Sequence, residues 1–213
     1  MAELSPELQH VFKGLDEANR GLESVRADVE YESVMQVWDD AETSMGEMSF
    51  LKPNLLHLKL GGPRNEEAYC DGEHWWIITH EDEQVEKYAV STDEEAPAEA
   101  AFLTFGLGQD SSKLLEEYEV TLKEKIEPQE PEDPVRYRLR FLPRDKEAPA
   151  RFSAVEVELA EGIWLPQTLV LEESDGEILQ TFRFVNMEIN PDLGPEDFTC
   201  DVPRGYTIIE PDA

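Results

Sequence analysis

The chain has 213 residues, a length that suits a single domain. It carries 49 acidic residues against 18 basic ones, a net charge of −31. That charge argues against a nucleic-acid partner and against docking on an anionic membrane, because both need a basic footprint. It also favours a monomer, and it fits either a general solubility or salt adaptation or a basic partner. No stretch approaches the ~18 apolar residues that a membrane-spanning helix needs.

The first predicted element is an amphipathic helix over residues 6–23. Ser5 can cap it, Pro6 fits its first turn, and apolar residues then recur three or four positions apart. Period-two alternation follows the helix, with Gly61-Gly62-Pro63 and Asp71-Gly72 as turns between apolar runs. This pattern predicts strands over 25–31, 56–60, 68–70, 75–78 and 85–90.

The segment 97–118 interrupts the strand pattern. Residues 97–105 are typical of a short apolar helix that ends at Gly106 and Gly108. A helical turn over 111–116 follows, with Ser111 or Ser112 as its cap. Strands are then predicted over 135–141, 155–159, 165–171, 178–189 and 198–209, which makes about ten in all.

Two of the later strands carry complementary charges. Arginines alternate with apolar residues over 136–140, and glutamates do so over 156–158. If these strands are neighbours, the arginine row faces the glutamate row across the sheet. The element order therefore predicts a mainly β fold: one large antiparallel sheet whose apolar face is covered by helices.

Motifs for catalysis are scarce. His10, His57, His74 and His80 show no metal-binding spacing, and no nucleophile elbow, P-loop or dinucleotide motif occurs, so neither a metal nor a cofactor is expected. His57 and His74 alternate with apolar neighbours and are expected to face solvent. An enzyme is therefore the weaker hypothesis, and either histidine buried beside a carboxylate would count in its favour.

Cys70 and Cys200 belong to no CxxC motif. They are either a disulfide formed in an oxidising compartment or two buried or half-buried thiols.

Apolar residues gather in two places beyond the regular pattern. Trp75 and Trp76 are adjacent, so one side chain points to each face of a strand. Phe102, Leu103 and Phe105 are crowded into one short helix. Both clusters are either ordinary core or the walls of an apolar ligand cavity.

The order of several motifs is similar to that of the LolA family of lipoprotein carriers. The stretch 46–56, with Lys52-Pro53-Asn54-Leu55, resembles the family's strand and its basic-Pro-Asn-Leu sequence. Residues 71–76 are similar to its DG hairpin with tryptophan, 102–118 to its lid helices, and 198–206 to its terminal strand and Pro-x-Gly turn. Each motif is weakly specific alone, but the ordered set spans essentially the whole chain.

The resemblance implies an open, unclosed antiparallel β-barrel over residues 1–213, a single domain covered by the N-terminal helix and by short lid helices. It implies an acyl-binding cavity and, at Lys52, a residue that tethers the lid, where well-studied members carry arginine; the flexible lysine should make a looser latch. The residues expected to line the cavity are Leu56, Leu58, Leu60, Trp76, Phe102, Leu103, Phe105, Tyr137, Leu139, Phe141, Phe182 and Phe184.

The resemblance also implies a carrier that ferries lipoproteins across the periplasm, from an inner-membrane release complex to an outer-membrane acceptor. The polar N-terminus is not a signal peptide. The chain is therefore either cytoplasmic or a mature domain with a new start, and the resemblance favours the second. The alternatives are an envelope sensor of lipids or lipoproteins, a glycolipid-binding protein on the same fold and, less favoured, an enzyme.

Overall fold

The computed structural model describes residues 4–38, 40–90, 105–108, 110–128, 130–131, 133–145 and 152–210. Contacts within the chain divide it into two compact units. Unit 1 consists of Met1–Gly21, Ser33–Ala41 and Phe105–Arg183, and unit 2 of Leu22–Glu32, Glu42–Thr104 and Phe184–Ala213. The expected single domain stays a prediction.

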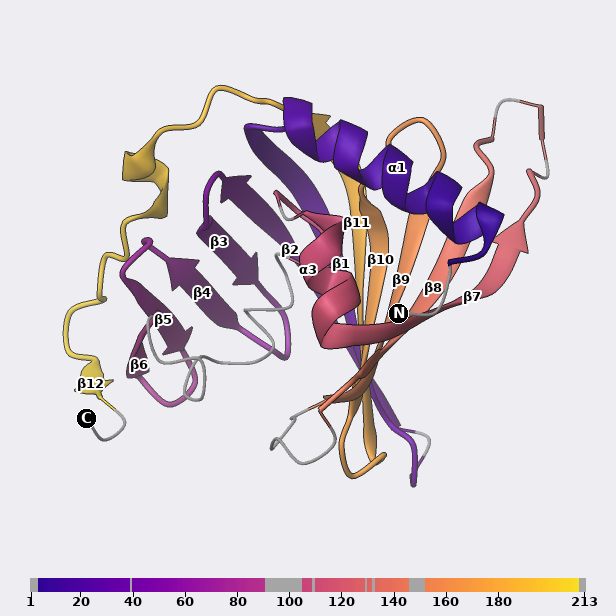
Figure 1. Ribbon diagram of the computed structural model, residues 1–213. Coiled ribbons are helices and arrows are strands. Elements are labelled where there is room, and N and C mark those ends of the chain that lie inside the picture. The colour runs from indigo at the N-terminus through magenta and orange to yellow at the C-terminus, as the bar shows by residue number, and fades with distance from the viewer. Residues whose placement is uncertain are drawn as a thin grey trace. The chain divides into compact units, whose positions relative to one another are not determined.

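Twelve strands follow one another in a single hydrogen-bonded order, β12-β6-β5-β4-β3-β2-β1-β11-β10-β9-β8-β7 (Figure 1). β12 pairs parallel with β6, and the other pairings whose register is known are antiparallel. The order ends at β7 and β12, so the described sheet is open. The predicted class, mainly β with an open antiparallel sheet, is confirmed. The strands are β1 (Ser24–Met35), β2 (Asp40–Leu51), β3 (Leu55–Leu60), β4 (Glu66–Cys70), β5 (His74–Thr79), β6 (Gln84–Ala89), β7 (Tyr118–Ile126), β8 (Arg136–Pro143), β9 (Phe152–Ala160), β10 (Pro166–Glu173), β11 (Ile178–Ile189) and β12 (Thr207–Ile209).

Unit 1 combines the helices α1 (Pro6–Gly21) and α3 (Ser111–Glu117) with strands β7 to β10. The predicted N-terminal helix is confirmed, and Ser5 Oγ accepts a hydrogen bond of 3.2 Å from the Leu8 amide at its start. The helix buries its apolar stripe. A Cβ atom on Gly14 would overlap the indole of Trp164, so this glycine permits a close approach between α1 and the turn after β9.

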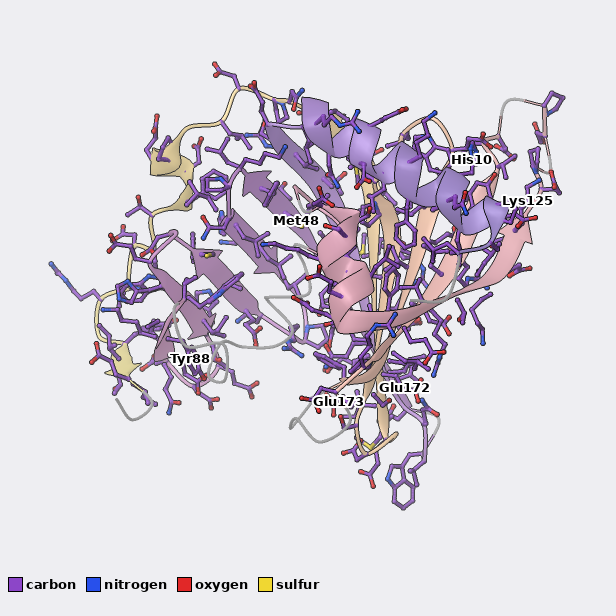
Figure 2. All side chains as sticks on the ribbon, viewed as in Figure 1. His10, Met48, Tyr88, Lys125, Glu172 and Glu173 are labelled. Carbon is purple, nitrogen blue, oxygen red and sulfur yellow. The ribbon has the colours of Figure 1, made fainter. Side chains whose placement is uncertain are left out.

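The predicted charge ladder lies on the polar face of unit 1. Arg138 pairs in register with Glu158, and Arg140 with Glu156. Arg140 also donates to Glu172 of β10 at 2.8 Å; Glu172 is labelled in Figure 2. Neighbouring strands therefore carry opposite charges, as the alternation predicted.

Unit 2 is built on β3 to β6, which are joined by short turns, together with β12 and the 3₁₀ turn η1 (Pro195–Phe198). Side chains alternate between buried and less buried along β3. A sheet with one apolar face produces this pattern.

The structure differs from the predicted elements in a missed strand, a shortened strand and a helix cap. β7 was missed, because the alternation of Tyr118, Val120 and Leu122 is short: a bulge interrupts it between Leu122 and Glu124, and the rest of this edge strand is mostly charged. The strand expected over 198–209 shrinks to β12, since η1 ends at Phe198, a turn lies at Gly205, and the residues between them are irregular. The cap of α3 is Asp110, which accepts from the Ser112 amide, rather than Ser111 or Ser112. The helix expected over 97–105 lies outside the described residues except for Phe105, which lies in a turn.

Candidate binding site

The apolar face of unit 1 is a continuous surface across five strands. Leu139 on β8 faces Leu122 on β7 and Val157 on β9, and Val157 faces Leu169 on β10. Leu169 in turn faces Phe182 on β11. Paired residues share one face of a sheet, so the register brings together four of the predicted cavity residues. These are Tyr137, Leu139, Phe141 and Phe182, none more than 4% exposed.

Phe105 packs on this face. Its ring lies edge-on to Phe141 at 4.8 Å between centroids and to Tyr118 at 5.5 Å. Only 6% of Phe105 is exposed. Burial raises the pKa of the Tyr118 hydroxyl to about 12, which is consistent with an apolar environment.

Two polar side chains of α1 hold the segment that carries Phe105. Asn19 Nδ2 donates to the Gly106 carbonyl at 2.9 Å, and Asn19 Oδ1 accepts from the Gly108 amide at 2.9 Å. Asp16 accepts from the Ser111 amide at 3.0 Å and from the Ser111 hydroxyl at 2.8 Å. Sequence reasoning missed both residues. The available signal was Asn19 itself, a polar residue four positions after Leu15 on the apolar stripe, buried in the structure.

Unit 2 has an apolar face of its own. Leu56 faces Cys70, and Cys70 faces Trp75 across β3, β4 and β5. Leu58 and Leu60 follow Leu56 at two-residue spacing, and all three are at most 5% exposed. Phe184 on β11 is also buried, at 4%.

The placement of Trp76 corrects the sequence prediction. Trp76 faces Tyr69 and therefore shares the face of His57, not that of Leu56. There it lies against the Lys87 ammonium, 4.9 Å from the ring centroid, and its indole N–H donates to Asp71 at 2.9 Å. The two adjacent tryptophans were rightly assigned to opposite faces, but the apolar face takes Trp75, because β4 and β5 pair in that register.

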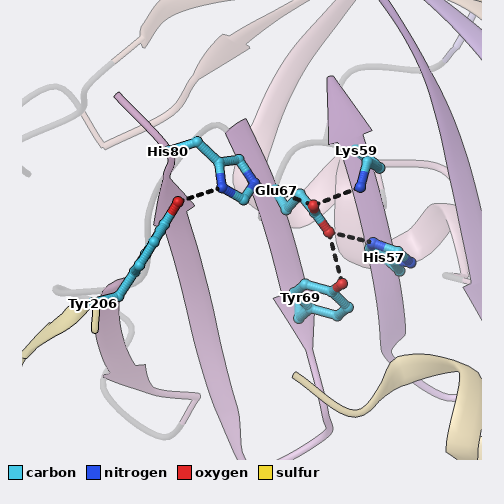
Figure 3. Close-up of polar contacts among 6 residues, drawn as sticks. All are labelled: His57, Lys59, Glu67, Tyr69, His80 and Tyr206. Carbon is cyan, nitrogen blue, oxygen red and sulfur yellow. Dashed lines mark hydrogen bonds and ion pairs between the residues drawn. The ribbon is translucent and has the colours of Figure 1, made fainter. Parts of the chain in front are cut away.

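A polar cluster centred on Glu67 occupies this second face of unit 2 (Figure 3). The carboxylate, 11% exposed, accepts hydrogen bonds from Lys59 at 2.7 Å and from the Tyr69 hydroxyl at 2.8 Å. His57 and His80 lie 3.3 and 3.1 Å from it. Burial acts to raise the pKa of Glu67, but the hydrogen bonds from Lys59, Tyr69 and His80 outweigh it and lower that pKa to about 2.

His57 bears directly on the enzyme alternative, because it is half-buried beside a carboxylate. Burial lowers its pKa, despite the charge of Glu67. However, His57 faces away from Leu56 and Leu58, and its ring stacks on Tyr69 at 4.0 Å. The cluster is therefore not part of the apolar face, and its carboxylate is already taken up by four side chains.

Other expected site residues have simpler outcomes. Lys52 follows β2, and its amide donates to the Glu23 carbonyl at 2.9 Å. Its role as lid latch stays a prediction, because Phe102 and Leu103 lie outside the described residues.

Cys70 and Cys200 are free thiols rather than a disulfide. Within the described ranges, no group of three or more histidines, cysteines and carboxylates is placed to hold a metal, and no helix is long and apolar enough to cross a membrane.

Comparison with known proteins identifies the family to which this open antiparallel sheet belongs. The family described as "Outer membrane lipoprotein carrier protein LolA" matches residues 25–201, and the chain belongs to this family. This is a family of carriers, and the resemblance seen in the sequence is confirmed.

One relative agrees with that assignment in sequence, and two solved structures share the fold. The chain is 26% identical over 171 residues to an outer-membrane lipoprotein carrier protein of Halorhodospira halophila, covering 80% of this chain and 72% of that protein. Its fold is similar to an uncharacterized conserved protein of Thermus thermophilus, with a TM-score of 0.58 and 11% identity over 96% and 99% of the two chains. It is also similar to MucB, with a TM-score of 0.51 and 18% identity over 92% of this chain and 64% of MucB.

Proposed function

We propose that the chain binds the acyl chains of lipoproteins on its apolar sheet faces and carries them across the periplasm to the outer membrane. The observation that carries the proposal is the row from Leu122 to Phe182 in unit 1. Five strands there present apolar side chains in register, and a sixth apolar group, Phe105, packs on them from outside the sheet.

The physical need for such a surface is simple. Each methylene group of a lipid chain costs about 0.8 kcal/mol when it is exposed to water, so a lipidated protein needs a carrier to cross an aqueous space. Apolar walls hold a chain without directional contacts, and chains of different length can therefore occupy the same surface. The donor and acceptor that the family implies are an inner-membrane release complex and an outer-membrane acceptor.

The polar cluster around Glu67 supports a structural role more than catalysis. Its low pKa keeps the carboxylate ionised at neutral pH, and Lys59, His57, His80 and Tyr69 already surround it. A general base with so low a pKa is a poor proton acceptor. An enzyme on this scaffold would therefore need another site, and the carrier proposal is the better supported one.

The test is native mass spectrometry of the purified chain with a synthetic triacylated lipopeptide and with the same peptide lacking its acyl chains. We expect a complex with the lipopeptide and none with the bare peptide. Leu122→Ser should weaken the complex, because it places a hydroxyl in the apolar row of unit 1. Arg138→Gln is the matched control, since Arg138 lies on β8 but points to the other face.

Three outcomes would redirect the proposal. Equal binding of both peptides would show recognition of the peptide, as a sensor of proteins requires. Binding of a glycolipid in preference to the lipopeptide would indicate the glycolipid-binding alternative. No uptake of any acylated ligand would refute the carrier function.

A further inference from the structure

The turn between β1 and β2 exposes three large apolar side chains within four residues. Met35 is 42% exposed, Val37 64% and Trp38 76%. Single apolar residues are common on protein surfaces, but a contiguous group that includes a tryptophan is not. None of the three belongs to the buried core, so the packing of unit 1 does not account for them.

The backbone of this turn is held in place by hydrogen bonds. The Gln36 amide donates at 2.8 Å to the carbonyl of Glu177, in the turn between β10 and β11. The Trp38 amide donates at 3.2 Å to the Met35 carbonyl. Both turns belong to unit 1. A partner that takes up the indole therefore meets an ordered backbone, and less conformational entropy is lost on binding.

The sequence of the two adjoining turns is acidic. Residues 33–41 contain two acidic residues and residues 173–180 contain three, and neither stretch contains a lysine or an arginine. Asp40, Asp175 and Glu177 are exposed. The apolar side chains of residues 35–38 are thus accompanied by carboxylates on both turns.

These charges distinguish between the possible occupants of the exposed turn. An anionic lipid surface would repel the carboxylates. A second copy of the chain would bring the same carboxylates and a net charge of −31 to the contact. A basic protein is the complementary partner, because charges at the rim of an interface pair with opposite ones. Tryptophan is also among the residues that most often supply the binding energy at the centre of such an interface.

We propose that residues 35–38 are a docking site for a basic protein, which takes the Trp38 indole into an apolar pocket bordered by lysine or arginine side chains. The inference goes beyond acyl binding and does not depend on it. It assigns two roles: Trp38 supplies most of the affinity, and the carboxylates of Asp175 and Glu177 accelerate association.

The first measurement is photo-crosslinking of the full chain in the cells that make it. The photoreactive residue p-benzoylphenylalanine is placed at Val37 and, as the control, at Glu119 on the edge strand β7, which is also exposed. We expect a protein adduct at position 37 that is absent at position 119 and is lost when Trp38→Ala is added. Mass spectrometry should place the crosslink in a segment of the partner that contains lysine or arginine. A phospholipid adduct, a dimer of this chain, no adduct, or an adduct that survives Trp38→Ala overturns the proposal.

The second measurement is the affinity of the purified crosslinked protein for variants of the full chain. Trp38→Ala should weaken the complex at least about tenfold. Ile163→Ala is the matched control, because Ile163 is an exposed apolar residue in another turn of unit 1, and it should leave the affinity unchanged. Circular dichroism of both variants checks that they are folded. Equal affinities of the two variants overturn the proposal.

The charges are tested by the same protein pair. The double variant Asp175→Lys with Glu177→Lys should slow association, and added salt should slow association of the wild type, because it screens the attraction between the two surfaces. A wild-type association rate that is independent of salt, or a double variant that associates as fast as the wild type, rules out a basic rim.

Discussion

Lys59 and Glu67 face each other across the pairing of β3 and β4, and the Lys59 ammonium donates to Oε1 of Glu67 at 2.7 Å. Lys59 is largely exposed, whereas Glu67 is nearly buried, so the carboxylate depends on its partners far more than the lysine does. The consequences can be measured as a function of pH.

We expect Glu67→Gln to lower the free energy of unfolding by about 2–3 kcal/mol at pH 7. The pKa of this carboxyl falls from an ordinary 4.5 to about 2 on folding. The ionised carboxylate therefore contributes its full stabilisation to the free energy of unfolding above pH 4.5, and this stabilisation is lost as the pH falls towards 2. Urea denaturation at pH 7 and at pH 3 should show a difference between wild type and variant that shrinks at pH 3. Glu119→Gln, on exposed β7, is the control, and a constant difference at both pH values would contradict the assignment.

Two glycines of α1 offer a matched pair of substitutions. A Cβ atom at Gly14 would overlap the Trp164 indole, whereas one at Gly21 meets nothing within 4 Å. Gly14→Ala should therefore cost about 1–3 kcal/mol by overpacking. Gly21→Ala should be neutral or stabilising by up to about 1 kcal/mol. Thermal unfolding of the two variants compares their melting temperatures. Equal values would contradict the close packing of Gly14 against the Trp164 indole.

The thiols should be slow to react in the native protein. Burial, with the nearby charges of Glu67, Asp201 and Asp71, raises the pKa of Cys200 to about 11, and burial also raises the pKa of Cys70. Only about a thousandth of Cys200 is then thiolate at pH 8. We expect Ellman's reagent to titrate two thiols rapidly in guanidinium and neither rapidly in buffer. No thiol in guanidinium without reductant would instead indicate a disulfide between Cys70 and Cys200.

Trp38 and Trp75 should differ sharply in their effect on stability. Trp38 is 76% exposed in the turn between β1 and β2, and Trp75 is 6% exposed on the apolar face of unit 2. Trp38→Ala should change the free energy of unfolding by less than about 0.5 kcal/mol, and Trp75→Ala should cost about 3–5 kcal/mol. Guanidinium titrations monitored by circular dichroism compare them, and a large loss for Trp38→Ala would show that its side chain is buried in solution.

The sequence predicted the fold class, the N-terminal helix and the Arg–Glu ladder because each depends on a periodicity that survives in one sequence. It did not predict β7, because its apolar alternation covers only residues 118–122 before a bulge interrupts it at Leu122 and Glu124. It also assigned Trp76 to the wrong face, because alternation alone does not say which of two adjacent tryptophans shares the face of Leu56.

The hydrogen bonds from Asp16 and Asn19 of α1 to residues 106–111 could not be predicted from the sequence either. Asp16 and Ser111 are 95 positions apart, and no local pattern links them. By contrast, the burial of the apolar residues of β8 and β11 could be predicted, since an apolar row needs only the right parity along each strand, and their role in lining a cavity stays a prediction. Long-range polar contacts therefore mark the limit of sequence reasoning for this protein.

The division of the chain into two units has a consequence for how it is made. Each unit is assembled from three separate stretches, and unit 1 needs both its first 21 residues and residues up to 183. During synthesis α1 emerges long before the strands that bury its apolar stripe, so that stripe has no partner until most of the chain exists. No single cut yields either unit intact, and a chaperone that shields residues 6–21 during synthesis should raise the yield of folded protein.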